Sequence, residues 1–172
     1  IDPAVGYLAC GDTGAGKMPE PETLLNYILR ECACEKDMKG LKVLVTAGPT
    51  QEAIDPVRYI TNHSSGKMGY AIAKMAMLRG ADVTLVCGRT ALAPPPFVRE
   101  VPVVTARDMY EAVTSVSQEQ DIIIKAAAVA DYRPASVSDE KIKKKDDDMS
   151  IALERTDDIL KYLGEHKPDG QF

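Results

Sequence analysis

Apolar and polar positions change their spacing in a regular way from Leu41 onward. Short apolar runs, typical of strands covered on both faces, alternate with stretches in which apolar residues recur every three or four positions, as on one face of a helix. The runs predict strands at residues 42–47, 81–87, 101–104, 121–127 and 151–153. The helical spacing predicts helices at residues 65–79, 106–118 and 157–163.

Local residues support these helix ends, since Gly80 is placed to stop the first helix and Thr105 to cap the second. Strand–helix alternation predicts an α/β fold, a Rossmann-like doubly wound parallel sheet with helices on both faces. Ligands bind beyond the carboxyl ends of the strands in such sheets. The loops at residues 48–64 and 128–145 are therefore the places to look for a site.

Residues 1–40 follow a different pattern. Residues 1–21 are rich in Gly and Pro and predict turns, residues 22–34 have the spacing of one helix, and residues 35–40 are charged like a linker. A loop and one helix cannot bury a core. We therefore expect two parts, residues 1–40 from another domain and residues 41–172 as a domain of their own. The absence of an initiator Met and the stop at Phe172 indicate a piece of a longer protein.

Composition excludes several classes. The 172 residues are 45% hydrophobic and 27% charged, ordinary values for a globular domain, and no apolar run is long enough to cross a membrane. The formal net charge of −5 argues against a general nucleic-acid binder. The chain opens without the order of a signal peptide, and its four cysteines form neither a disulfide framework nor a zinc site. These features predict a reduced, cytoplasmic protein.

The segment Thr61–Gly69 is the first candidate site. It places Ser64, Ser65, Gly66 and Lys67 at the expected start of a helix. The free N–H groups of a first helical turn and the positive end of the helix dipole attract an anion there. The alternative is that Ser64 or Ser65 only caps the helix, with the glycines loosening the loop.

Two further segments should reach the same edge of the sheet. Small residues that include Ala127 and Ala128 follow the fourth strand and allow a ligand close to the backbone, and Asp131 is suited to a divalent ion that bridges phosphates. A polar loop that could move carries the lysines Lys141, Lys143, Lys144 and Lys145. Taken singly, Asp131 could be a turn residue and the lysines a solvated run. Together the three segments favour a site for a nucleoside triphosphate or another polyanion.

Other motifs suggest functions that fit less well. Gly11–Lys17 has the spacing of a P-loop, but Met18 replaces the hydroxyl residue that binds Mg²⁺, so we exclude that motif. Tyr70 and Lys74 have the spacing of a short-chain-reductase pair, but they lie on the first helix of the fold, where we expect Tyr70 to border the core and Lys74 the solvent. The first strand lacks G-x-G-x-x-G. Because Arg89 would tolerate a 2′-phosphate, an NADP-binding oxidoreductase of this type stays as the alternative.

Longer stretches of the chain resemble a known family. The matching stretches from Leu41 to Phe172 are VLVTAGPT (43–50), DPVRYI (55–60), NHSSGKMG (62–69), AAVADY (127–132) and KIKK (141–144). They closely resemble phosphopantothenoylcysteine synthetase, the carboxy-terminal half of a bifunctional flavoprotein of coenzyme A biosynthesis in the DNA/pantothenate metabolism flavoprotein family. Residues 6–21 look like the flap that ends the decarboxylase half of that protein.

The resemblance implies a CTP-dependent ligation of 4′-phosphopantothenate to cysteine through an acyl-cytidylate, with a divalent ion such as Mg²⁺. Asn62 would then assist the second step, and Lys141 would support cytidylate formation. Substrate or nucleotide contacts would come from Ser64, Ser65, Gly66, Lys67, Ala127, Ala128, Asp131, Lys143, Lys144 and Asp158, with Asp131 also placing the metal.

The resemblance also implies a homodimer whose loops reach across the interface. Cys10 corresponds to the acid that protonates the product of the decarboxylase, but the FMN-binding sheet is absent, so we expect this chain neither to bind FMN nor to decarboxylate alone. A further alternative is a truncated domain that binds nucleotide without turnover.

Overall fold

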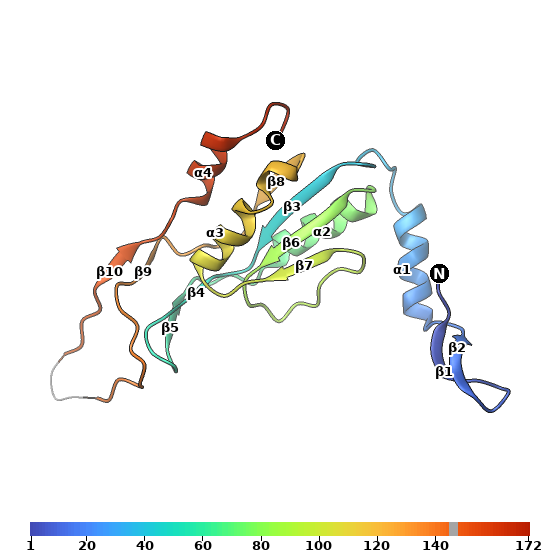
Figure 1. Ribbon diagram of the computed structural model, residues 1–172, viewed down its shortest axis with the longest axis horizontal. Helices are drawn as coiled ribbons and strands as arrows, with labels where there is room; N and C mark the ends of the chain where they lie inside the picture. Colours follow the sequence, from blue (N-terminus) through green and yellow to red (C-terminus); the bar gives the residue numbers. More distant parts are fainter. Residues whose placement is uncertain (145–147) are drawn as a thin grey trace.

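The computed structural model describes residues 1–144 and 148–172. Lys145, predicted to belong to the cationic loop, lies outside the described residues. The body is a four-stranded sheet in the order β7-β6-β3-β8 (Figure 1). Its strands are β3 (Lys42–Ala47), β6 (Asp82–Cys87), β7 (Arg99–Pro102) and β8 (Ile122–Lys125). All three pairings are parallel, which confirms the predicted sheet. The order of connection reverses at β3, so the crevice for a ligand is expected beyond the carboxyl ends of β3 and β8.

Helices cover both faces of the sheet, as the alternation predicts (Figure 1). Val43 and Val45 of β3 face α2 (Lys67–Leu78) in one hydrophobic cluster. Leu44, between them, belongs to a second cluster with α3 (Ala106–Thr114) and α4 (Ile159–His166). Successive residues of a strand point to opposite faces, and each face of β3 is therefore apolar.

The helix ends agree with the sequence at Thr105 and Gly80 and differ elsewhere, for example at the end of α4, which is His166 and not residue 163. Thr105 and Asp108 form a capping box at the start of α3, and Gly80 follows α2 with φ +95°. In contrast, α2 begins at Lys67 after Gly66 rather than at Ser65, and α3 ends at Thr114, before a 3₁₀ turn at Ser117–Glu119. The last helix, α4, begins at Ile159, later than predicted, because the side chain of Asp158 caps it.

Two short hairpins beside the sheet were missed or misplaced by the sequence pattern. One joins β4 (Gln51–Ala53) to β5 (Tyr59–Thr61), and the other joins β9 (Tyr132–Pro134) to β10 (Leu153–Arg155). The strand predicted at residues 151–153 is thus shifted by two residues. Three-residue strands with mixed exposure are too short for a period of two to stand out.

The amino-terminal segment lies at one end of the molecule (Figure 1). The expected turns at residues 1–21 are wrong in part, because β1 (Ala4–Tyr7) and β2 (Thr13–Lys17) form an antiparallel hairpin. This hairpin also rules out a P-loop, which would need a loop leading directly into a helix. The following helix, α1 (Pro21–Cys32), has no buried residue. In the described part of the chain, every helix is too short or too polar to span a membrane.

Candidate functional site

The backbone beyond β3 and β8 is closely hydrogen-bonded. The hydroxyl of Thr46 accepts from the N–H groups of Ala126 and Ala127, both at 3.2 Å, and the N–H of Ala128 donates to the carbonyl of Gly48 at 2.9 Å. The predicted binding residues Ala127 and Ala128 therefore have no free N–H for a phosphate. The carbonyl of Ala128 is also occupied, since it accepts from the N–H of Thr50 at 3.2 Å and from Asn62, so these residues contribute the close approach that a small side chain allows.

Asn62 joins the two loops that meet at this crevice. It follows β5 directly, and its amide nitrogen donates to the carbonyls of Ala128 at 3.1 Å and Val129 at 3.3 Å. Its side chain is nevertheless exposed. Asn62 is thus held by the segment after β8 while remaining accessible to a ligand.

The start of α2 is not capped by a side chain. Gly66 is the N-cap residue, with φ 74°, and the hydroxyl of Ser64 accepts from the N–H of Gly66 at 3.4 Å instead of from the first helical turn. Ser65 and Lys67 are exposed. The capping alternative is therefore wrong for Ser64 and Ser65, and the anion-binding interpretation stays a prediction.

Close packing explains why residue 66 is a glycine. A Cβ there would lie 2.8 Å from the Cγ2 of Thr90 and 3.2 Å from the backbone nitrogen of Gly48, and the positive φ disfavours any other residue. The helix thus starts directly against the loop that leaves β3. Because only residues 62–66 separate β5 from α2, the N–H groups at the start of α2 lie at the same edge of the sheet as Asn62.

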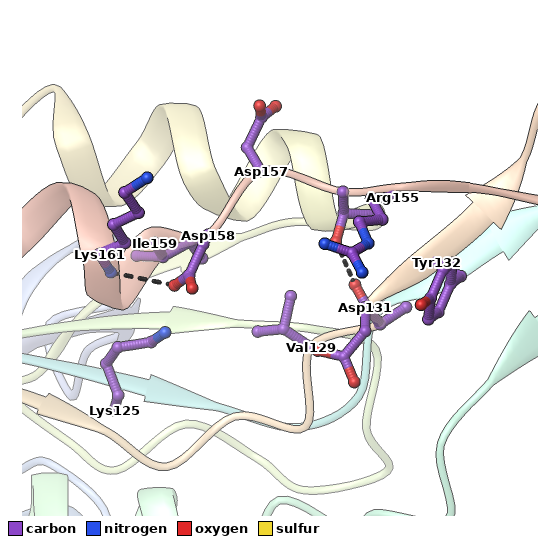
Figure 2. Close-up of a pocket in the computed structure, with 11 residues that line it drawn as sticks. Lys125, Val129, Asp131, Tyr132, Arg155, Asp157, Asp158, Ile159 and Lys161 are labelled. Atoms are coloured by element: carbon purple, nitrogen blue, oxygen red, sulfur yellow. Dashed lines mark hydrogen bonds between the residues drawn. The ribbon is translucent and has the colours of Figure 1, made fainter.

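A cavity of about 570 Å³ opens beside the end of β8 (Figure 2). It is lined by acidic and basic side chains, among them Lys125 of β8, Arg155 of β10 and Lys161 of α4. Asp131, in the loop after β8, and Asp158, the N-cap residue of α4, also line it. The ammonium group of Lys125 and the carboxylate of Asp158 face each other across it (Figure 2). A cavity with both signs of charge suits a phosphorylated ligand that carries a metal ion.

The electrostatics of Lys125 reflect this setting. Although the residue as a whole is exposed, desolvation at its ammonium lowers the pKa of Lys125 and the nearby Asp158 carboxylate opposes that shift. Asp158 also accepts from the backbone N–H of Lys161 at 3.0 Å as the cap of α4. Its predicted ligand contact would therefore use a carboxylate that the fold has already oriented.

Sequence reasoning missed Lys125, Arg155 and Lys161. The signal for Lys125 was available, because it ends an otherwise apolar strand at the carboxyl end, where a charged residue is not needed for packing. Arg155 and Lys161 carried no such signal, since they lie in polar stretches whose position depends on the β9–β10 hairpin and on α4.

The described lysines of the cationic loop, Lys141, Lys143 and Lys144, do not line this cavity. Lys143 and Lys144 line a separate hollow of about 690 Å³ together with Arg58, and Lys141 lines neither cavity. The expected convergence of three segments is found for two of them, because Asn62 contacts the segment after β8, although Asn62 and Ser64 to Lys67 do not themselves line this cavity. Cys10 lies farther off, in the exposed turn of the β1–β2 hairpin.

A divalent ion would find only part of a coordination shell here. Among residues 1–144 and 148–172, no three His, Cys, Asp or Glu side chains are grouped as metal ligands. Asp131 and Asp158 do supply the carboxylate oxygens that Mg²⁺ prefers. Mg²⁺ keeps several waters and is often shared with substrate phosphates, so these two residues fit an ion that arrives with a nucleotide.

The reductase pair is not arranged for catalysis. Tyr70 is buried, its hydroxyl accepts from Thr90 at 3.2 Å, and desolvation raises the pKa of Tyr70 to about 12. Lys74 is exposed, as expected. Tyr70 is therefore buried against Thr90 and Glu100 and is not presented to a ligand together with Lys74.

Comparison with known proteins assigns the family. The family model described as "DNA/pantothenate metabolism flavoprotein C-terminal domain" matches residues 38–172. The chain belongs to this family. The coenzyme A biosynthesis bifunctional protein CoaBC is 50% identical in Bacillus subtilis (strain 168) and 48% identical in Escherichia coli (strain K12), each over 172 residues. These matches cover 98% and 96% of this chain but only 42% of each relative, so the chain spans less than half their length.

Solved structures agree with the family resemblance that the motifs indicate. The crystal structure of the C-terminal domain of CoaBC has a TM-score of 0.68 and 55% identity, over 78% of this chain and 62% of that one. The DNA/pantothenate metabolism flavoprotein from Streptococcus pneumoniae has a TM-score of 0.67 and 28% identity, over 75% and 66%. A Cab2 mutant in complex with phosphopantothenate-cysteine is 18% identical with a TM-score of 0.66, over 86% and 68%, and supports the fold alone.

Proposed function

We propose that this chain contributes to coenzyme A biosynthesis as a CTP-dependent ligase that joins 4′-phosphopantothenate to cysteine. The similarity to CoaBC over nearly the whole chain supports the pathway. The observation in the structure that carries the proposal is the charged cavity beside Asn62, at the crevice beyond β3 and β8. Such a position is where doubly wound sheets bind nucleotides.

The reaction has two steps. A carboxylate oxygen of 4′-phosphopantothenate attacks the α-phosphorus of CTP, which forms an acyl-cytidylate as the bond to pyrophosphate breaks. The amine of cysteine then attacks the acyl carbon, and the amide forms as CMP leaves with the bonding electron pair. The first step is needed because a carboxylate is a poor electrophile, and the mixed anhydride provides a good leaving group.

The residues divide between these steps. Lys125 and Lys141 would neutralise phosphate charge, and the N–H groups at the start of α2, with Ser64 to Lys67, would hold a phosphate. Asn62 would orient the acyl group for attack by the amine. Mg²⁺, held by Asp131, would supply charge neutralisation on the triphosphate.

The longer relatives suggest how this chain fits a larger protein. We propose that residues 1–40 complete a decarboxylase domain in which Cys10 is the proton donor and FMN is the cofactor, while residues 41–172 form the ligase domain. We further propose a homodimer of the ligase domain.

Product formation tests the function directly. The purified chain is mixed with CTP, 4′-phosphopantothenate, cysteine and Mg²⁺, and pyrophosphate and phosphopantothenoylcysteine are measured. Binding of CTP is compared with binding of NADPH. Tight NADPH binding without pyrophosphate would favour the reductase alternative, whereas CTP binding without any product would favour a nucleotide-binding domain that has no turnover.

Asn62→Asp separates the two steps. The new carboxylate would face the carbonyls of Ala128 and Val129 without a donor, so we expect acyl-cytidylate to accumulate while amide formation falls on the order of 100-fold. Asn26→Asp makes the same change on α1 and should leave both steps intact. Unimpaired amide formation by Asn62→Asp would contradict the role assigned to Asn62.

A further inference from the structure

The turn between β4 and β5 contains a buried carboxylate with an unusual number of donors. The side chain of Asp55 has no exposed surface. One of its oxygens accepts from the backbone N–H groups of Val57 and Arg58 at 2.9 and 2.8 Å, and the other accepts from the Arg58 guanidinium. These four bonds lie within the turn and fix its shape.

A fifth bond leaves the turn. The second oxygen of Asp55 also accepts, at 3.1 Å, from the backbone N–H of Ile142, which is 87 residues farther along the chain. The guanidinium of Arg58 donates to the carbonyl of the same residue at 3.0 Å. The peptide groups on both sides of Ile142 are therefore held, which fixes the direction of the backbone and not only its distance.

Ile142 is the residue between Lys141 and Lys143. The approach to it is anchored to the same turn, since the N–H of Ser138 donates to the carbonyl of Ile54 at 3.0 Å. The backbone that carries the predicted phosphate-binding lysines is thus fastened at two points to residues 54–58. The turn continues through β5 into Asn62, so one element connects the two separated parts of the candidate site.

We propose that Asp55, with Arg58, is a positioning residue that latches the backbone at Ile142 and so places Lys141 for cytidylate formation. This inference rests on the proposed function and deepens it. The contacts of Asp55 and Arg58 with the backbone of Ile142 are called the latch below. The latch acts on the first step, because Asn62 is held separately, by the carbonyls of Ala128 and Val129. The Arg58 guanidinium holds the pKa of Asp55 well below its usual range, so the carboxylate is ionised at neutral pH.

Two variants break the latch, one at the carboxylate of Asp55 and the other at the backbone N–H of Ile142. Asp55→Asn keeps an oxygen for the turn but removes the charged acceptor shared by Ile142 and Arg58. Ile142→Pro removes the N–H donor and leaves Asp55 and Arg58 unchanged. Asp139→Asn removes one negative charge from an exposed residue of the same loop and serves as the matched control.

The two half-reactions are measured separately, pyrophosphate release from CTP and 4′-phosphopantothenate, then amide formation from isolated acyl-cytidylate and cysteine. We expect Asp55→Asn and Ile142→Pro to slow the first roughly 10-fold or more and to leave the second unchanged. In a Lys141→Gln background, Asp55→Asn should add no further loss, because both changes remove the same placed ammonium group. Equal losses in both half-reactions, no loss in either, or additive losses with Lys141→Gln would overturn the proposal.

Hydrogen exchange distinguishes failure of the latch from failure of the proposed function. Absence of pyrophosphate with the unaltered protein would refute the ligase function. Independently of activity, the amide of Ile142 should be protected in the unaltered protein and in Asp139→Asn, and exchange at least about 10-fold faster in Asp55→Asn. An Ile142 amide that exchanges equally fast in all three proteins would refute the latch itself.

Discussion

The parallel sheet and residues 1–40 use the same residue types in opposite ways. A Cβ on Gly88, directly after β6, would collide with the backbone of Pro49, whereas a Cβ on Gly14 in the amino-terminal hairpin would make only an ordinary side-chain contact. Leu85 is fully buried, whereas Leu25 on α1 is 52% exposed. Periodic apolar residues predict a helix in both regions, but no residue of α1 is buried, whereas α2 buries Ala73 and Met77 against the sheet. Residue type and spacing therefore indicate the element and not its burial.

Glycine gives the largest expected contrast. A Cβ on Gly88 would lie 1.9 Å from the carbonyl oxygen of Pro49, so the two loops would have to separate. We expect Gly88→Ala to cost more than about 4 kcal/mol of unfolding free energy or to prevent folding, as measured by urea denaturation. Gly14→Ala, whose nearest atom would be 3.7 Å away, should fold normally, and equal losses would break the comparison.

Leucine gives the next largest effect. Leu85→Ala should cost about 2–5 kcal/mol, because it removes buried methyl groups and leaves a cavity between the sheet and α2. Leu25→Ala should change the unfolding free energy by less than about 0.5 kcal/mol. Urea denaturation of both variants measures the difference. A large loss at Leu25 would mean that α1 is covered in solution.

Cysteine reactivity extends the contrast to chemistry. Cys87 is buried and donates to Glu100 at 3.2 Å, and burial raises the pKa of its thiol to about 11. Cys10 and Cys32 are exposed. At about pH 8 we expect iodoacetamide to modify Cys87 on the order of 100-fold more slowly than Cys10, followed by mass spectrometry. Prior unfolding in urea should remove the difference, and rapid native labelling of Cys87 would contradict its burial.

Ion pairs give the smallest effect. Arg58 and Arg79 lower the pKa of Asp55 and Asp37, respectively, below the ordinary value of 3.8. Each pair therefore stabilises the fold fully above that value, and the contribution is lost as the pH falls toward the folded-state pKa. Thermal unfolding should show no loss from either pair between about pH 8 and about pH 5.

Below about pH 4 the buried pair should dominate the acid loss, because the exposed pair is screened by solvent. Asp55→Asn should lower the unfolding midpoint more than Asp37→Asn at neutral pH and should flatten the acid limb. Equal shifts from the two variants would show that burial does not distinguish these pairs.

Much of the sheet could be predicted from the sequence because its determinants are local. The apolar runs that gave β3, β6 and β8 are continuous, and the Thr105–Asp108 capping box lies within four residues. The predicted element boundaries were wrong where a contact between distant residues sets them. One example is the start of α2, where Gly66 has a left-handed conformation and packs against Gly48 and Thr90. The two short hairpins were not predicted correctly, because a three-residue strand is too short to show the alternation of apolar and polar residues.

Some features of the candidate site could likewise be predicted from the sequence, and others could not. The sequence by itself determined that the strands are parallel, the edge at which a ligand would bind, and the motifs that resemble the family, since these depend on residues close together in the chain. Tertiary structure alone decided that Lys125 faces Asp158, that Asn62 is held by Ala128, and that Ile142 is held by Asp55. The last two contacts span 66 and 87 residues, and each joins a side chain to a backbone group, which offers the same donor or acceptor at nearly every position. The pattern of side chains along the sequence therefore does not predict such a bond.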